Sequence, residues 1–263
     1  MAGAPCFASD YDGTLDFHLG GGVSARDRAA IDRFREAGGL FGIDTGRTLR
    51  GITDSAAGRL PLDFYVAMSG ALVLDAKREV VWERRLEREV LFDLVRHTRL
   101  RSLGLYLIMG NEYWTASPVS LVRRNRSMFS FARSLKDIPD PLYGVAFRML
   151  STKLATSMAG YVNRTYGDIV TAYQNGMSVD VVPTGCSKAT GLDIVRRELG
   201  AGLVGSMGDS YNDIPMLQAA DVGYTFAKSP EQVRGAANVL VPSVADALGD
   251  FARRAGLGGE ALV

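Results

Sequence analysis

The sequence predicts an α/β protein whose parallel sheet begins near the N-terminus, is interrupted by an inserted α/β unit, and is completed afterwards. Two observations support this fold class. At both ends of the 263-residue chain, short apolar runs alternate with segments of helical periodicity, which is the βαβ rhythm of a parallel sheet. The middle of the chain loses this rhythm and holds paired strands instead. We therefore expect a core domain formed by residues 1–82 and 183–263, and an inserted domain formed by residues 83–182.

The first part of the core is expected to alternate strand and helix. The apolar run at 5–10 predicts a short buried strand. Ser24 is a favourable N-cap for a helix over 24–39, and Gly38 offers that helix a left-handed stop. Further apolar runs predict strands over 40–45, 62–68 and 71–76.

The inserted unit and the end of the core follow in the same way. In the inserted unit we expect helices over 86–100, 120–135 and 153–166, an aromatic patch at 112–116, and strands over 103–110, 142–150, 168–175 and 177–183, the last two paired. In the resumed core we expect helices over 187–199, 211–220, 230–237 and 243–256, and strands over 202–209 and 221–226.

Composition excludes several classes of protein. Hydrophobic residues make up 47% of the chain and charged residues 22%, with a net charge of +1, so a broad electrostatic attraction to nucleic acid is not expected. Cys6 and Cys186 are the only cysteines, which fits thiols in a reducing compartment. No signal peptide is evident, and no apolar run approaches the roughly 18 residues of a membrane span. A cytoplasmic location without membrane contact is the expectation.

Polar residues follow the predicted strands at the point where each strand ends. In open parallel sheets, ligands bind beyond the carboxyl ends of the strands. The residues that we expect at this edge are Asp10 and Asp12 after the first strand, Thr45, Gly46 and Arg47 after the second, Lys188 at the start of a helix, and Asp209 after the strand over 202–209.

Three of these side chains predict a metal site. Asp10, Asp12 and Asp209 offer the hard oxygen ligands that Mg²⁺ prefers, and a cation would relieve their mutual repulsion. Asp213 lies four residues after Asp209 and is expected to orient Lys188 or a metal-bound water. Gly13 continues a turn whose backbone N–H groups can face an anion.

An acidic metal site beside a hydroxyl and an ammonium group indicates phosphoryl chemistry. Thr45 supplies the hydroxyl and Lys188 the ammonium. One carboxylate at such a site can attack phosphorus, while a second protonates the leaving oxygen and then takes a proton from water. Asp10 and Asp12 are the candidates for these two roles, and their spacing does not say which residue takes which.

Four short motifs give the chain a resemblance to a known family. They are "DYDGT" at Asp10–Thr14, "DTGR" at Asp44–Arg47, "GCSKATGL" around Lys188, and "GDSYND" at Gly208–Asp213. In this order and at these separations the chain resembles the haloacid dehalogenase superfamily, specifically its Cof-type phosphatases of class IIB. The resemblance covers the whole chain.

The resemblance implies a Rossmann-like core with an inserted C2-type cap that sets substrate specificity. It implies Asp10 as nucleophile and Asp12 as acid and base, with Mg²⁺ held by Asp10, the Asp12 carbonyl and Asp209. The catalytic set also includes Thr45 and Lys188. Asp12 is the acid that phosphotransfer members have and dehalogenases lack. Substrate contacts are expected from Gly13, Gly46, Arg47 and Asn212.

The chain also departs from the family pattern. Ser69 stands where many Cof-type members have Asn, and Lys228 lies near the position of another common Asn. These departures weaken any transfer of substrate identity. Arg47 has an alternative role at a helix start, and Asp209 has one as an N-cap.

Several other polar residues have simpler interpretations. Cys186 is most simply a spectator beside Lys188, Cys6 a packing residue, and His18 a loop residue. Tyr113 and Trp114 are candidate substrate contacts in the inserted unit. The arginines Arg123, Arg124 and Arg126 are more simply a solvated helix face than substrate contacts.

The function that these observations favour is a Mg²⁺-dependent phosphomonoesterase that hydrolyses a small phosphorylated metabolite, with a sugar phosphate as the preferred class, through an aspartyl-phosphate intermediate. Two alternatives remain open. One is a phosphomutase of the same fold, which excludes water and so keeps the phosphoryl group. The other is a metabolite-binding regulator that no longer catalyses.

Overall fold

The computed structural model describes residues 3–16, 22–98, 106–116 and 129–257. Their contacts divide the chain into two compact units. The first unit comprises Met1–Thr45, Ile52–Glu83 and Ser187–Val263, and the second comprises Gly46–Gly51 and Arg84–Cys186. Each unit is described by itself.

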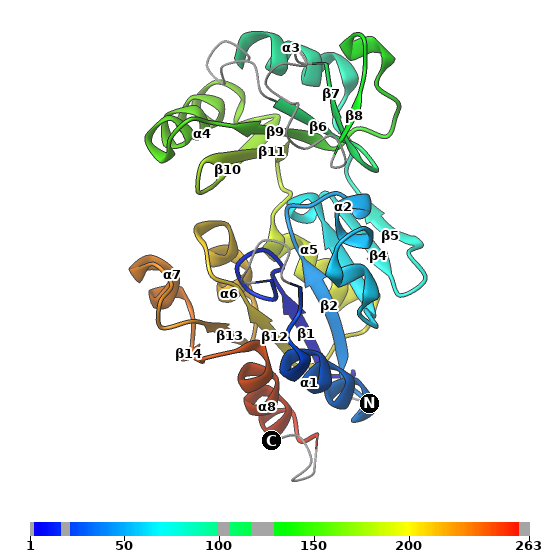
Figure 1. The fold of residues 1–263 in the computed structure, drawn as a ribbon, viewed down its shortest axis with the longest axis vertical. Coiled ribbons are helices and arrows are strands. Elements are labelled where there is room, and N and C mark those ends of the chain that lie inside the picture. The colour runs from blue at the N-terminus through cyan, green and yellow to red at the C-terminus, as the bar shows by residue number, and fades with distance from the viewer. Residues whose placement is uncertain (1–2, 17–21, 99–105, 117–128, 258–263) are drawn as a thin grey trace. The chain divides into compact units, whose positions relative to one another are not determined.

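The first unit is built on an eight-stranded sheet in the order β14-β13-β12-β1-β2-β3-β4-β5 (Figure 1). Strands β14 through β3 in this order are parallel neighbours. The strands are β1 (Cys6–Ser9), β2 (Leu40–Asp44), β3 (Phe64–Ala67), β4 (Leu72–Asp75), β5 (Val80–Glu83), β12 (Val204–Met207), β13 (Val222–Thr225) and β14 (Val239–Leu240).

One edge of this sheet is antiparallel, which the βαβ interpretation did not predict. β4 pairs antiparallel with β3, and β5 pairs antiparallel with β4. Only the short 3₁₀ turn Met68–Gly70 and Ala71 separate β3 from β4, whereas a parallel crossover needs about a dozen residues. The chain must therefore reverse its direction between β3 and β4. In addition, the sequence did not predict the strands β5 and β14.

Different helices cover the two faces of the sheet. On one face the ring of Phe7 stacks on that of Phe41 with centroids 6.2 Å apart, and it lies 5.5 Å from that of Phe251 in helix α8. On the other face Ala8 belongs to a buried cluster that includes residues of α5 and α6. Alternate residues of a strand point to opposite faces of the sheet. Asp10 comes two residues after Ala8 and therefore lies on the same face, the one that α5 covers.

Most helices of the first unit begin at caps visible in the sequence. Ser24 accepts from the backbone N–H of Asp27 at the start of α1, and Ser187 accepts from Thr190 at the start of α5. Gly38, with φ of +94°, follows α1 in the left-handed conformation expected there. The helices of this unit are α1 (Ala25–Glu36), α5 (Lys188–Glu198), α6 (Ile214–Ala219), α7 (Glu231–Ala236) and α8 (Val244–Arg254). Its 3₁₀ turns are η1 (Ala56–Arg59), η2 (Met68–Gly70) and η5 (Tyr211–Asp213). The residues of the short helix α2 (Leu49–Thr53) are divided between the two units.

The second unit is a six-stranded mixed sheet in the order β10-β11-β9-β6-β7-β8. The predicted pair is present, since β10 and β11 are antiparallel. The elements are α3 (Arg88–Thr98), β6 (Tyr106–Met109), β7 (Tyr113–Thr115), β8 (Phe129–Phe131), η4 (Leu135–Asp137), β9 (Gly144–Arg148), α4 (Thr152–Tyr166), β10 (Val170–Asn175) and β11 (Ser178–Pro183).

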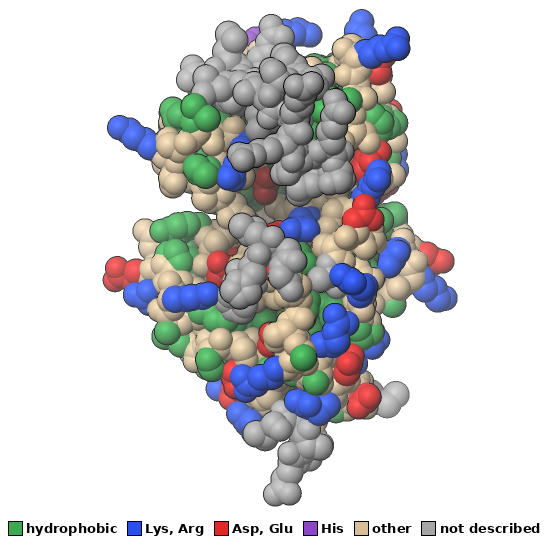
Figure 2. Space-filling model, in the orientation of Figure 1, with side chains coloured by type: hydrophobic (Ala, Val, Ile, Leu, Met, Phe, Trp, Pro, Cys, Tyr) green, Lys and Arg blue, Asp and Glu red, His purple; other side chains and the backbone are tan. Residues whose placement is uncertain are grey.

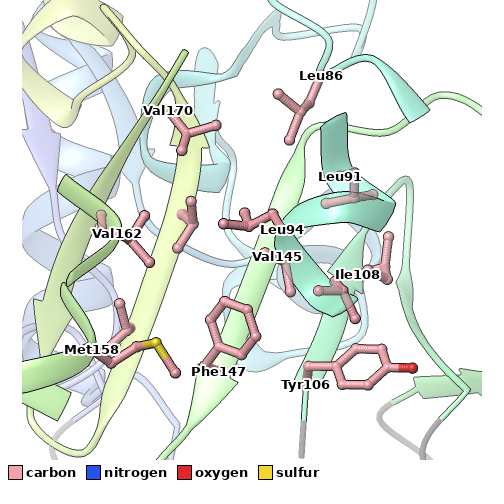
Figure 3. Packing of buried hydrophobic residues seen from close by; sticks show 14 of the residues in the cluster. Leu86, Leu91, Leu94, Tyr106, Ile108, Val145, Phe147, Met158, Val162 and Val170 are labelled. Atoms are coloured by element: carbon pink, nitrogen blue, oxygen red, sulfur yellow. The ribbon is translucent and has the colours of Figure 1, made fainter. Parts of the chain in front are cut away.

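The second unit has its own hydrophobic core. Figure 3 shows Leu94 of α3, Val145 and Phe147 of β9 and Met158 and Val162 of α4 within this core. Their side chains are almost completely buried. A domain with its own core can be stable as a unit.

The predicted basic helix over 120–135 is wrong in its described part. Residues Phe129–Phe131 form β8, which pairs parallel with β7, and a 3₁₀ turn follows at Leu135–Asp137. Phe129 and Phe131 alternate with Ser130, which is a strand period that the basic residues before them concealed. Arg123, Arg124, Arg126 and His18 lie outside the described residues.

The described helices and the charged surface of the first unit agree with two expectations from the sequence. Among the described helices, none is both long and apolar enough to cross a membrane. Basic and acidic side chains are interspersed over the face of the first unit in Figure 2, in keeping with the net charge of +1.

Candidate active site

The carboxyl ends of β1, β2 and β12 place the predicted residues at one edge of the sheet. β1 lies between β12 and β2 and is parallel to both. Asp10 follows β1, and its backbone N–H donates to the carbonyl of Met207 at the end of β12 over 2.8 Å. Thr45 follows β2, and Asp209 comes two residues after β12. The parallel order alone thus brings these three residues to a common edge.

Lys188 is the centre of the charged cluster. It is the first residue of α5, its side chain is 1% exposed, and its ammonium Nζ donates to Asp10 Oδ1 and Asp213 Oδ1 at 2.5 Å each. Burial lowers the pKa of Lys188, but the carboxylates Asp10, Asp213 and Asp44 together raise it above its usual value. The ammonium is therefore charged, and it holds the Asp10 carboxylate in a fixed rotation.

A second contact set fixes Asp213 and Asp209. Asp213 Oδ2 accepts from the backbone N–H groups of Asp209 at 3.0 Å and Ser210 at 2.9 Å. Asp209 Oδ1 accepts from the Thr14 hydroxyl at 2.9 Å. Asp10, Asp209 and Asp213 each offer a carboxylate oxygen, and these oxygens all lie within 4.8 Å of one another.

The cluster has more negative charge than Lys188 can neutralise. Burial is the main reason why the pKa of Asp10 is raised well above its usual value, and Asp213 and Asp209 add to the rise while Lys188 opposes it. Burial and then Asp213 raise the pKa of Asp209, against the Thr14 hydrogen bond, Lys188 and Lys228. A cation bound beside these buried and mutually repelling carboxylates would stabilise their charged forms.

The loop after β1 approaches Asp209 so closely that it requires glycine. Gly13 has φ of +91°, and a Cβ atom at this position would lie 2.7 Å from either carboxylate oxygen of Asp209. Its backbone N–H donates to the Asp16 carbonyl at 3.0 Å, and Asp12 forms an isolated bridge with Asp16. The loop thus folds back on itself beside the carboxylates.

A family model described as haloacid dehalogenase-like hydrolase matches residues 7–249. The chain belongs to this family. The match confirms the resemblance that rests on the four motifs, and it covers both units.

Three relatives of this haloacid dehalogenase-like hydrolase show how far the likeness extends. Stress response protein YhaX of Bacillus subtilis (strain 168) is 22% identical over 253 residues, covering 90% of this chain and 87% of the relative. The solved structure of the HAD subclass IIB sugar phosphatase BT4131 has a TM-score of 0.77 at 18% identity, with 97% of this chain and 100% of that chain covered. A HAD/COF-like hydrolase from Plasmodium vivax has a TM-score of 0.80 at 18% identity, with 96% of both chains covered. These likenesses confirm the predicted α/β fold class, with a parallel core sheet and a second mixed sheet consistent with a C2 cap.

The remaining predicted residues of this hydrolase fall into two groups. Thr45 is buried in the first unit, where its carbonyl accepts from the Ser69 N–H at 3.0 Å. Asn212 is buried, and its amide oxygen accepts from the Ser210 hydroxyl. Gly46 and Arg47 belong to the second unit. There the Arg47 guanidinium donates to the Gly51 carbonyl at 3.1 Å, and the Tyr113 hydroxyl donates to the Gly46 carbonyl at 3.4 Å.

The residues that depart from the family pattern have distinct surroundings. Ser69 has a left-handed backbone with φ of 51°, a conformation that asparagine adopts more readily than serine, and its hydroxyl has no hydrogen-bond partner within the described chain. The Lys228 ammonium lies 5.2 Å from the centroid of the Phe226 ring and contributes to the field at Asp209. Trp114 packs against the hydrophobic core of the second unit.

Asp44 is the site residue that the sequence interpretation missed. It is 0% exposed, and in the described part of the chain neither carboxylate oxygen has a hydrogen-bond partner. Burial raises the pKa of Asp44 well above its usual value; Lys188 opposes the shift, and Asp213 and Asp10 add to it. The sequence signal for Asp44 is its place in "DTGR", where a charged residue ends a buried strand.

The two cysteines are poor nucleophiles. Burial raises the pKa of Cys186 to about 11, against a weaker effect of Arg84, and burial also raises the pKa of Cys6. Because the thiolate is the reactive form, neither residue is suited to covalent catalysis at neutral pH.

Proposed function

We propose that this haloacid dehalogenase-like hydrolase is a Mg²⁺-dependent phosphomonoesterase, with Asp10 as its nucleophile. One observation supports the proposal most strongly: Lys188 links Asp10 to Asp213 through two 2.5 Å hydrogen bonds, and the carboxylate of Asp209 lies within 4.8 Å of both. A buried nucleophile with an adjacent cation and spare carboxylates suits phosphoryl transfer.

The donor set fits a hard divalent cation. Oxygens of three carboxylates lie within 4.8 Å of one another, two of these carboxylates share one ammonium group, and a second cation would relieve the repulsion among them. Asp10, Asp209 and the Asp12 carbonyl are the proposed ligands, while Asp213 is engaged by Lys188 and by two backbone N–H groups. When bound, Mg²⁺ supplies charge neutralisation and a template for in-line displacement.

The protein's own residues perform the proton and bond transfers. Asp10 attacks phosphorus while the bond from phosphorus to the leaving oxygen breaks, and Asp12 donates its proton to that oxygen. Asp12 then removes a proton from water, whose oxygen attacks phosphorus. The bond between phosphorus and Asp10 breaks, its electron pair returns to the carboxylate, and inorganic phosphate leaves. Lys188 orients the Asp10 carboxylate for its attack on phosphorus and stabilises that carboxylate as it forms again.

The proposed substrate is a small phosphorylated metabolite, with a sugar phosphate as the preferred class. One structural relative is named a sugar phosphatase, and this name supports the choice of substrate class. Core residues face the phosphoryl group, which all candidate substrates share. Discrimination among them is therefore assigned to the second unit as a specificity cap. A cytoplasmic location completes the proposal.

A Mg²⁺-supplemented screen over several dozen phosphorylated metabolites tests the proposal, with Asp10→Asn as the inactive control. Release of inorganic phosphate from a sugar phosphate, absent in the control, is the expected result. An isomerised phosphosugar without phosphate release would identify a phosphomutase instead. A lack of turnover on every ester, p-nitrophenyl phosphate included, would favour the non-catalytic regulator.

A further inference from the structure

Asp44 is an unusual group to find in a protein interior. A fully buried carboxyl group without a hydrogen bond is costly, and natural proteins rarely keep one. Both of its oxygens lack a partner within the described residues, although the ammonium of Lys188 is the strongest cationic influence on it. A residue that costs stability in the resting state is a candidate for a role in another state.

The sheet geometry places Asp44 on the face where Lys188 lies. A Cβ atom at Gly42 would meet the ring of Phe64 at 2.4 Å, and Phe64 belongs to the same buried cluster as Leu192 of α5. Residues two apart in a strand share a face, so Asp44 is on this α5 side as well. Asp10 shares that face one strand away, because β1 and β2 pair in parallel with Ser9 opposite Ile43.

Among the described residues, Lys188 has two hydrogen-bond partners for the three N–H groups of its ammonium. A lysine ammonium has three donors, and in the described structure two of them bind Asp10 and Asp213. The proposed cycle weakens one of these acceptors, because Asp10 becomes an acyl phosphate, and neither its bridging oxygen nor its carbonyl oxygen keeps the negative charge of a carboxylate. At that stage another anionic anchor on the same face would hold Lys188, and among the described residues Asp44 is a buried carboxyl group whose two oxygens have no hydrogen-bond partner.

We propose that Asp44 is a positioning residue that accepts a hydrogen bond from Lys188 while Asp10 is phosphorylated. The proposal rests on the aspartyl-phosphate cycle described above. No bond to Asp44 is made or broken; it accepts an N–H and releases it when the carboxylate of Asp10 is regenerated. A carboxyl group retains an acceptor oxygen in either protonation state, so this role needs no change in its charge.

Loss of the Asp44 acceptor should slow only the second half of the cycle, the hydrolysis of the acyl phosphate. During attack on the substrate, Asp10 itself holds Lys188, so the first step does not need Asp44. During hydrolysis of the acyl phosphate, an ammonium group held by Asp213 alone would stabilise the returning carboxylate less well. Loss of a hydrogen bond to a charged group slows a step by about 10- to 100-fold.

The test compares Asp44→Leu and Asp44→Ala, which lack an acceptor, with Asp44→Asn, which keeps one. Rapid-quench kinetics with p-nitrophenyl phosphate separates nitrophenol release, which reports the first step, from phosphate release, which reports the second. Thermal unfolding confirms that each variant is folded, and Asp44→Ala serves if the larger leucine is not accommodated.

The expected result is a nitrophenol burst in the leucine and alanine variants, followed by phosphate release about 10- to 100-fold slower than in the wild type. In the Asp44→Asn variant the rate of phosphate release should be close to that of the wild type. Equal slowing of both steps, an asparagine variant as slow as leucine, or no slowing at all would overturn the inference. A wild-type enzyme that never forms phosphorylated Asp10 would instead overturn the proposed function.

Discussion

Replacement of Lys188 by methionine tests the electrostatic structure of the site in the metal-free protein. The ammonium is 1% exposed and bound to two carboxylates that are themselves buried, so little of its effect is screened by water. Removal of one partner from a buried ion pair costs about 3–5 kcal/mol, because the remaining charges are left uncompensated. We expect Lys188→Met to lower the free energy of unfolding by about this amount at pH 8 in the presence of EDTA.

The pH dependence of this loss follows from the raised pKa values of Asp10 and Asp44. A carboxyl group whose pKa is higher in the folded than in the unfolded protein stabilises the fold below its unfolded pKa of about 4. This contribution is lost as pH rises through the folded pKa. Lys188 lowers the pKa values of Asp10 and Asp44, so both pKa values rise further when its ammonium is removed. The loss in Lys188→Met should therefore be small near pH 4 and increase towards pH 8.

Urea unfolding with EDTA, repeated with MgCl₂, measures these effects. The matched control is Lys228→Met, which removes an exposed ammonium near the same site and should cost no more than about 1 kcal/mol. Mg²⁺ should recover part of the stability that Lys188→Met loses, since it supplies positive charge to the same carboxylates. A loss below 1 kcal/mol at pH 8, or a loss independent of pH, would refute the reasoning.

Three further predictions concern the metal, the acid and the loop. EDTA should abolish phosphatase activity and Mg²⁺ should restore it, with Ca²⁺ a poor substitute because of its looser coordination; full activity after stringent chelation would contradict a metal-dependent mechanism. Asp12→Asn should reduce turnover of a sugar phosphate by about 10²–10⁴-fold, and turnover of p-nitrophenyl phosphate by less, because nitrophenol leaves without protonation; equal losses would rule out the general-acid role. Gly13→Ala should weaken Mg²⁺ binding measured by calorimetry, since its Cβ would press on the Asp209 carboxylate; an unchanged affinity would show that the loop yields without moving Asp209.

Much of the site could be predicted because parallel strands converge at their carboxyl ends. Asp10 and Asp209 are separated by almost 200 residues in sequence, yet each follows a strand, and those strands are neighbours in the sheet. Lys188 could be placed because a capping serine precedes it and marks the helix start. The predictions that failed lacked such a signal. The antiparallel edge depends on a short turn around Ser69, and apolar patterning alone does not give strand direction.

Asp44 shows a different limit of sequence interpretation. A charged residue at a strand end is usually paired or solvated, and the pattern does not reveal whether a partner will reach it. In the structure, Lys188 binds Asp10 and Asp213 but not Asp44. That outcome depends on side-chain packing around a helix that begins 144 positions later in the sequence, so it becomes visible only in three dimensions.

The covalent intermediate on Asp10 is the most direct test of the proposed function. The reaction of the Asp12→Asn variant with substrate is stopped by acid, and the phosphoryl group is located by peptide mass spectrometry. We predict one phosphoryl group on the peptide that contains Asp10, and none in the Asp10→Asn variant, which should also be inactive on every ester. A phosphoryl group on Cys186 or on a serine, or normal turnover by Asp10→Asn, would contradict the assignment of Asp10 as the nucleophile.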